Sequence, residues 1–393
     1  MIFNEIIFYL VFLLPSVALF HAADQTFRPW IIALFGMIFF GYFGYIHFGG
    51  KWGALALLIF VWELIVSRLY RPGSKWCLFG VAQAVLILAA FKYLTFFSHA
   101  WDDALVLLSL PPMGPIPRVM LPLGISFFTF EFIHFAVDRY QGKIERATLA
   151  DYAAFIFFFP TMVAGPIKRY QEFVPKLHAA RLDPGLVSRG ITRILVGLAK
   201  KTVLADTFSL WSDKLNTSAL LNASGPQVLG WIFAYGMKIY FDFSGYSDIA
   251  IGCSYLFGIE VPENFRWPYL SRNISEFWRR WHISLGRWIF DYVYVPLGGS
   301  RRGEARTALN LLTAFAISGL WHGAAYNFVI WGLWHGVMMV VHRAWTRFSE
   351  TTGVRIPAPL GIALTFTGVT LGWGLFAMDI SRVGVALGRI ARR

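Results

Sequence analysis

Two histidines, His282 and His322, are the strongest candidates for acid–base chemistry in this sequence of 393 residues. Each directly follows a tryptophan, and His322 lies inside a long apolar run. Histidine accepts and returns a proton near neutral pH without a large shift of its pKa. A titratable side chain in an apolar run is costly to place in a bilayer, so it is usually functional. The pattern favours His322 as a general base, and the alternative is a structural histidine bonded to a backbone carbonyl.

The apolar run that contains His322 extends over residues 309–343 and is too long for one membrane span. At about 1.5 Å per residue it would reach roughly 50 Å, against a hydrocarbon core of about 30 Å. A break is predicted near Gly319, Gly323 and Asn327, which places His322 at a helix end. A second WHG motif carries His335, which shares a helical face with His342. We expect a stripe of side chains near a helix end there rather than a catalytic group.

His282 belongs to the segment FWRRWHISL, whose aromatic residues predict a helix that lies in the membrane interface. Arg279 and Arg280 would face water or phosphate groups from such a helix. They are the candidate binding residues for a phosphorylated donor, and a plain surface anchor is the alternative. Glu276 precedes His282 by six residues, a spacing that disfavours direct pairing between the two on one helix.

Four other titratable residues lie in apolar runs and need partners. Asp242 and Asp248 are expected to pair with basic side chains, although orienting a catalytic histidine is the alternative. Glu131 and His134 are three residues apart, a spacing that allows contact on a helix, and a structural role is expected for both.

Composition indicates a membrane protein: 57% of the residues are hydrophobic and 15% are charged, whereas soluble domains carry about 25% charged residues. The prediction is an all-α polytopic fold in one domain over residues 1–393, with about 10–12 membrane segments. Some runs are short and contain proline, such as those around Pro160 and Pro166. Broken helices are tolerated at membrane depth where they pack inside protein or line a cavity, which predicts a polar interior.

The net charge of +13 is concentrated in loops. Residues 167–201 and 266–306 are rich in lysine and arginine, so both segments and the arginine-rich C-terminus are predicted to be cytosolic. The N-terminus, with Glu5 and no basic residue before Arg28, is predicted to lie outside. This distribution excludes nucleic acid as a partner and indicates contact with membrane lipid. Residues 186–204 predict an amphipathic helix with Arg189, Arg193 and Lys200 on one face.

The sequence lacks the usual motifs of metal, nucleotide and serine-hydrolase chemistry. The two cysteines, Cys77 and Cys253, have no zinc-site spacing and are expected to be packed thiols. The remaining type of chemistry is one in which a histidine activates an oxygen or sulfur nucleophile. A transporter is the non-enzyme alternative, but it predicts inverted repeats, and none is visible.

Five segments resemble the membrane-bound O-acyltransferase family and follow one another in the family's order. They are LPLGISFFTFE (121–131), FFPTMVAGPIKRYQEF (158–173), YFDFSGYSDIAIGCSYLFGI (240–259), NFRWPYLSRNISEFWRRWHISLGRWIFDYVYVPLGGSR (264–301) and SGLWHGAAYNFVIWGLWHG (318–336). The residues of these segments are most similar to those of the bacterial branch that O-acetylates an exopolysaccharide such as alginate, or peptidoglycan. The branch that transfers D-alanine to teichoic acid is also similar.

The resemblance implies a ring of helices around a central tunnel in the bacterial inner membrane, with residues 121–343 as the catalytic core. It implies that His322 is the family's tunnel histidine and that His282 occupies its second position. The implied donor is cytosolic acetyl-CoA, with no metal. The implied partner is a periplasmic or membrane-anchored acetyltransferase that modifies the polymer. The chain ends soon after GWGLFAM (372–378), whereas many members continue with further spans.

Overall fold

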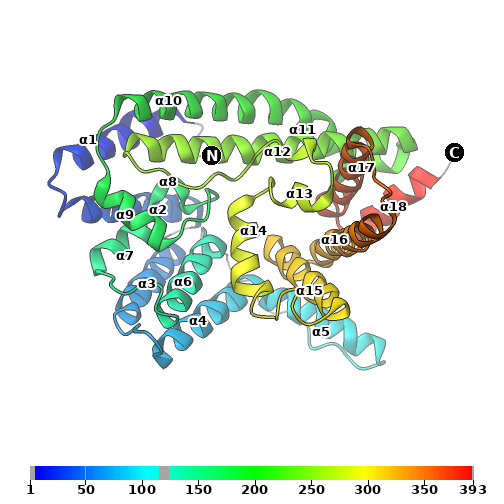
Figure 1. Cartoon of the computed structure of the whole chain (residues 1–393), viewed down its shortest axis with the longest axis horizontal. Helices are drawn as coiled ribbons and strands as arrows, with labels where there is room; N and C mark the ends of the chain where they lie inside the picture. The colour runs from blue at the N-terminus through cyan, green and yellow to red at the C-terminus, as the bar shows by residue number, and fades with distance from the viewer. Residues whose placement is uncertain (1–4, 49, 115–123, 392–393) are drawn as a thin grey trace. The chain divides into compact units, whose positions relative to one another are not determined.

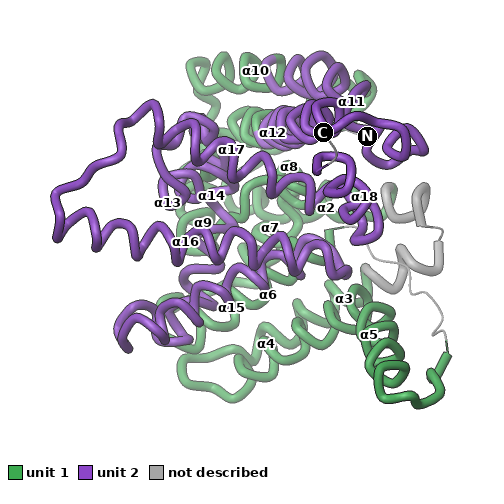
Figure 2. The backbone as a smooth tube through the Cα atoms, turned by 90° about the vertical axis from the view of Figure 1, so that its right-hand side faces the viewer, with its two compact units in different colours: residues 1–195, 248–262 green, residues 196–247, 263–393 purple. Residues whose placement is uncertain are grey.

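A computed structural model describes residues 5–48, 50–114 and 124–391, and within these ranges the regular structure is helical (Figure 1). The chain divides into two compact units, coloured separately in Figure 2. Unit 1 comprises residues 1–195 and 248–262, and unit 2 comprises residues 196–247 and 263–393. The prediction of one domain over the whole chain stays a prediction.

Unit 1 is built from helices of the N-terminal half, two of which are preceded or extended by a turn of π-helix. Its elements are η2 (Phe8–Leu13), α1 (Leu14–Ala22), α2 (Arg28–Phe48), α3 (Gly50–Ser67), α4 (Lys75–Leu88), η3 (Ala89–Tyr93), α5 (Leu94–Leu107), α6 (Ile125–Tyr140), α7 (Leu149–Ile156), α8 (Phe159–Met162), α9 (Tyr170–Ala179) and most of α10 (Pro184–Ala199).

The core of unit 1 is aromatic. Phe60 of α3 lies 4.5 Å from Phe128 of α6 and 4.7 Å from Phe157, between ring centroids. Helix α2 approaches α7 so closely that a Cβ atom added to Gly36 would lie 1.8 Å from the carbonyl oxygen of Phe157. The expected break near Pro160 is confirmed, because α7 ends at Ile156 and only the single turn α8 follows before α9.

Unit 2 contains the elements that carry the candidate histidines. They are η4 (Lys200–Ala205), α11 (Asp206–Ser212), η5 (Asp213–Asn216), η6 (Ser218–Asn222), most of α12 (Gly225–Leu256), η7 (Pro268–Leu270), α13 (Ile274–Trp278), α14 (Ile283–Ile289), η8 (Phe290–Tyr294), α15 (Glu304–His322), α16 (Tyr326–Thr352), α17 (Ala358–Ala377) and α18 (Ile380–Ala391).

Helices α15 and α16 form a helical hairpin joined by residues 323–325. The predicted break in the long apolar run is confirmed, and His322 is the last residue of α15. The two helices are held close by glycines. A Cβ atom at Gly319 would lie 2.1 Å from the carbonyl oxygen of Phe328, and one at Gly332 would lie 2.2 Å from that of Phe315. Small residues of this kind allow close backbone approach between membrane helices.

Among the described residues, two helical segments are long and apolar enough to cross a membrane, Lys75–Leu107 and Ala358–Ala377. Their outer surfaces are apolar: Leu86 of α4 is 67% exposed and Leu364 of α17 is 55% exposed. Such side chains suit contact with lipid. Several other apolar runs are divided into shorter helices, and the figure of 10–12 membrane segments stays a prediction.

Candidate active site

His322 lies within a wall of aromatic side chains contributed by α15, α16 and α17. Its ring centroid is 4.7 Å from that of Trp321, 5.1 Å from that of Trp331 and 5.2 Å from that of Phe376. The Trp331 and Phe376 rings meet the imidazole edge to face, at 86° and 73°. His322 is only partly buried, whereas Trp331 is fully buried. His322 therefore keeps part of its surface accessible beside an aromatic wall.

The end of α15 at His322 has a local cause. Gly323 is extended, with φ −162° and ψ 145°, and it stops the helix. A Cβ atom at Gly323 would lie 2.0 Å from the Phe328 ring, so a side chain there would push that ring away. The chain then re-enters a helix at Tyr326. Gly323 thus lies at the end of α15, packed closely against the Phe328 ring.

His282 does not lie in a continuous interfacial helix, so this prediction was wrong. Helix α13 ends at Trp278, α14 begins at Ile283, and His282 adopts the left-handed conformation at φ 43°, ψ 53° between them. A non-glycine residue at positive φ is strained and is held only by its surroundings. The strain at a candidate site supports a functional reading of His282.

Asn264 holds this turn. Its backbone carbonyl accepts the N–H of Ile283 at 3.0 Å, and its side-chain oxygen accepts the hydroxyl of Ser284 at 2.6 Å. Its amide group donates to the hydroxyl of Ser247 at 3.2 Å. Asn264 is fully buried. The residue was not singled out in the sequence, where the only signal is a polar side chain at the start of the family-like segment 264–301.

The His282 imidazole is 1% exposed, and neither of its nitrogens has a hydrogen-bond partner among the described residues. The edge of Phe243 faces it at 4.7 Å between centroids. Burial lowers the pKa of His282 to about 3. The ring is therefore neutral at pH 7, the form that accepts as well as donates a hydrogen bond.

One indole connects the two candidate histidines. The Trp321 ring lies 4.7 Å from His322 and 6.1 Å from His282, between centroids. The structure therefore brings together two residues that lie 40 positions apart in the sequence. Both belong to unit 2.

Arg279 and Arg280 are less free than a pair of phosphate-binding arginines would be. Arg280 donates to Glu276 at 2.5 Å, and Arg279 donates to the hydroxyl of Ser275 at 3.1 Å. The disfavoured pairing of Glu276 with His282 is not seen, since Glu276 serves Arg280 and the backbone N–H of Arg272. Arg279 remains exposed and Arg280 is partly buried.

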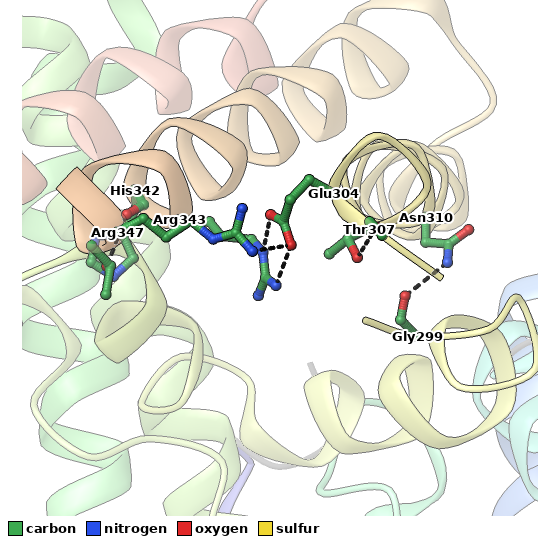
Figure 3. A network of polar contacts seen from close by, with 9 residues as sticks. Gly299, Glu304, Thr307, Asn310, His342, Arg343 and Arg347 are labelled. Atoms are coloured by element: carbon green, nitrogen blue, oxygen red, sulfur yellow. Dashed lines mark hydrogen bonds and ion pairs between the residues drawn. The ribbon is translucent and has the colours of Figure 1, made fainter. Parts of the chain in front are cut away.

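A cluster of charged residues lies at the end of the α15–α16 hairpin that is remote from His322 (Figure 3). Glu304, at the start of α15, accepts two hydrogen bonds from Arg343, at 2.8 and 2.9 Å, and also pairs with Arg347. Both arginines belong to α16. The cluster fastens the open end of the hairpin, opposite the end that carries His322.

The acidic residues of the apolar runs have structural partners, as expected for Asp242 and Asp248. Asp242 pairs with Lys201 within unit 2, and Asp248 pairs with Arg193 within unit 1. Glu131 does not use the neighbour on its own helix: it pairs with Lys168, 37 residues away. His134 pairs instead with Asp138 and accepts the backbone N–H of Tyr170 at 2.9 Å. Glu131 therefore has a partner distant in sequence, whereas His134 pairs with Asp138 four residues on along the same helix, α6.

No group of three or more histidine, cysteine, aspartate or glutamate residues arranged to hold a metal ion occurs in the described part of the chain. Both cysteines are free and buried.

Comparison with known proteins identifies the family of the chain. The model of the membrane-bound O-acyltransferase family, MBOAT, matches residues 59–369. The chain is 35% identical to the probable alginate O-acetylase AlgI of Pseudomonas syringae pv. tomato, over 96% of this chain and 73% of that protein. It is 34% identical to the peptidoglycan O-acetyltransferase of Helicobacter pylori (77% and 61%) and 30% identical to the teichoic acid D-alanyltransferase of Bacillus subtilis (83% and 85%).

The chain belongs to the membrane-bound O-acyltransferase family. It is a helical membrane protein and an acyltransferase, as the resemblance predicted, and it is related to alginate O-acetylases.

Proposed function

We propose that this acyltransferase moves an acetyl group from cytosolic acetyl-CoA across the bacterial inner membrane, for O-acetylation of an extracytoplasmic polysaccharide such as alginate. The observation that carries the proposal is the position of the partly buried His322 at the end of α15, with the Trp321 indole between it and the buried His282. The similarity to alginate O-acetylases over 96% of the chain supports the choice of acyl group and polymer.

In this proposal His322 is the general base. Its imidazole accepts the proton of the attacking hydroxyl as the oxygen forms a bond to the thioester carbonyl carbon. The carbon–sulfur bond then breaks, and the proton passes to the leaving sulfur to give CoA. A positioned base of this kind typically contributes about 10²- to 10⁴-fold to the rate.

His282 is the second residue of the proposed site. Its neutral ring, held at positive φ, would hydrogen-bond the donor from the cytosolic side. Arg279 and Arg280 would attract the phosphates of CoA by charge. Their contacts with Ser275 and Glu276 leave both guanidinium groups with unused donors, since arginine has five.

The proposed surroundings follow from the charge pattern and the family. A ring of about 10–12 membrane helices would enclose the tunnel, with residues 121–343 as its core. The N-terminus would lie outside and the C-terminus in the cytosol. The acetyl group would pass to a periplasmic or membrane-anchored acetyltransferase partner. At the C-terminus, a fused reporter that works only in the cytosol should be active, and one that works only in the periplasm should be inactive. The opposite result would contradict this orientation.

The test of the proposal is His322→Ala, compared with His342→Ala on the same hairpin. Both variants are expressed in a host whose own gene is deleted, and insertion is verified by the amount of protein in the membrane. Mass spectrometry of the polymer should show acetylation reduced by about 100-fold or more for His322→Ala. His342→Ala should retain acetylation. Normal acetylation by inserted His322→Ala would refute the role of His322.

Two alternative acyl transfers have relatives in their favour. Similarity to a peptidoglycan O-acetyltransferase and to teichoic acid D-alanyltransferases supports a different polymer or a D-alanyl group. Mass spectrometry of each purified cell-envelope polymer separates the three, since acetyl and D-alanyl groups differ in mass and the polymer that carries the acetyl group is identified directly. A transporter is disfavoured by membership of an acyltransferase family.

A further inference from the structure

Three aromatic side chains beside the proposed site leave their polar nitrogens unused. His335 is 0% exposed, in the middle of α16, rather than part of a stripe at a helix end as the sequence suggested. Its ring centroid is 5.0 Å from that of Trp278 and 5.0 Å from that of Trp331. Trp278 and Trp331 are 5.9 Å apart. These three residues, from α13 and α16, are called the indole–imidazole cluster below.

The nitrogens of this cluster are buried and unsatisfied. Among the described residues, Nε1 of Trp278, Nε1 of Trp331 and both ring nitrogens of His335 have no hydrogen-bond partner. Burying a polar group without a partner is costly, and nearly all such groups in native proteins are paired. The neighbouring Trp373 shows the normal case, because its Nε1 donates to the Tyr269 hydroxyl at 3.0 Å.

The balance of donors and acceptors defines what would satisfy the cluster. Each indole is a donor only, and a neutral imidazole supplies one donor and one acceptor. The cluster therefore holds three donors and one acceptor. An N–H group directed at a ring face recovers only part of a normal hydrogen bond. The matching ligand is an oxygen atom that accepts more hydrogen bonds than it donates.

The cluster shares a wall with the proposed active site. The Trp331 indole lies 5.1 Å from His322 on one side and 5.0 Å from His335 on the other, between centroids. We propose that Trp278, Trp331 and His335 bind a hydrogen-bond-accepting oxygen, supplied either by the thioester carbonyl of the acyl donor or by a buried water. The first source rests on the proposed function, and the second does not.

The experiment observes the indole N–H groups directly. The full chain is labelled with ¹⁵N-indole tryptophan in lipid nanodiscs, and Trp278→Phe and Trp331→Phe assign the two resonances. A thioester carbonyl shifts both resonances with acetyl-CoA and not with CoA, which lacks that oxygen. A buried water gives magnetisation transfer from water to both groups in the absence of donor. If neither effect appears while wild-type protein binds acetyl-CoA, the proposal is overturned.

A binding measurement gives a second readout. If the carbonyl is the ligand, Trp331→Phe should lower the preference for acetyl-CoA over CoA by about 3- to 10-fold, the usual worth of one hydrogen bond. Trp373→Phe is the matched control and should keep that preference. His322→Ala should also keep it while losing transfer. Absence of acetyl-CoA binding by the wild type would count against the proposed donor, separately from the cluster.

Discussion

The hydroxyl of Ser284 donates to the side-chain oxygen of Asn264 at 2.6 Å, and this bond anchors the turn that carries His282. The same asparagine accepts the N–H of Ile283 through its backbone. His282 is thus held at positive φ from the residues that follow it, by a side chain 18 positions upstream.

Replacing Asn264 should therefore disturb the backbone conformation of His282, although His282 itself is unchanged. Asn264→Ala removes the bonds of the Asn264 side chain to the Ser284 and Ser247 hydroxyls, and each buried hydrogen bond that is lost costs about 0.5–1.5 kcal/mol. We expect lower thermal stability and at least a tenfold loss of acyl transfer per inserted molecule. Ser284→Ala removes one donor only and should lose less of both. Equal effects of the two variants would contradict the central place of Asn264.

Close packing of the α15–α16 hairpin predicts that Gly319 cannot carry a side chain. A Cβ atom there would lie 2.1 Å from the carbonyl oxygen of Phe328, so the helices would have to separate. Gly319→Ala should lower stability by about 1–3 kcal/mol, the usual cost of overpacking. Gly230→Ala in α12 meets nothing within 4 Å and should be neutral or stabilising. Thermal unfolding in detergent compares the two, and an unchanged midpoint for Gly319→Ala would argue against this close approach.

The buried pair of Lys168 and Glu131 predicts non-additive mutations. Lys168 is 1% exposed and also lies over the ring of Phe155 at 4.7 Å. Removing one partner leaves an uncompensated buried charge, which costs about 3–5 kcal/mol. Lys168→Met alone should reduce the yield of folded protein, and the double variant with Glu131→Leu should recover most of it. Additive losses in the double variant would show that the two residues do not act as a pair.

Asp379 predicts a pH-dependent start of α18. The Ser381 hydroxyl, and then the backbone N–H of Arg382, hold the pKa of the Asp379 carboxyl below its usual value. A lowered folded-state pKa stabilises the helix above the ordinary pKa of about 4, and this stabilisation is lost as the pH falls through the lower folded value.

At neutral pH, Asp379→Ala should loosen α18 by about 1 kcal/mol, as loss of a cap does. Hydrogen exchange of the α18 amides measures this, with α17 as the internal reference. Asp379→Asn keeps an oxygen acceptor and should exchange more slowly than the alanine variant. Identical exchange in the wild type and in both variants would show that Asp379 does not stabilise the start of α18.

The sequence by itself determined the helical membrane class, the family and the end of a helix at His322. Each depends on local or additive properties: the apolar content, the residues of the motifs, and the glycines within an apolar run that is too long for one membrane span. The amphipathic pattern of residues 186–204 likewise predicted the helix that begins at Pro184, because helical periodicity is a local property.

Only the tertiary structure decided the features that depend on distant partners. The turn at His282 was taken for a helix because Asn264, which stabilises its positive φ, lies outside any local window. Glu131 found Lys168 rather than a neighbour on its own helix. His335 was predicted to belong to a stripe near a helix end, but it is buried against Trp278 of α13 and Trp373 of α17, since burial is set by which elements pack together and not by spacing along one helix.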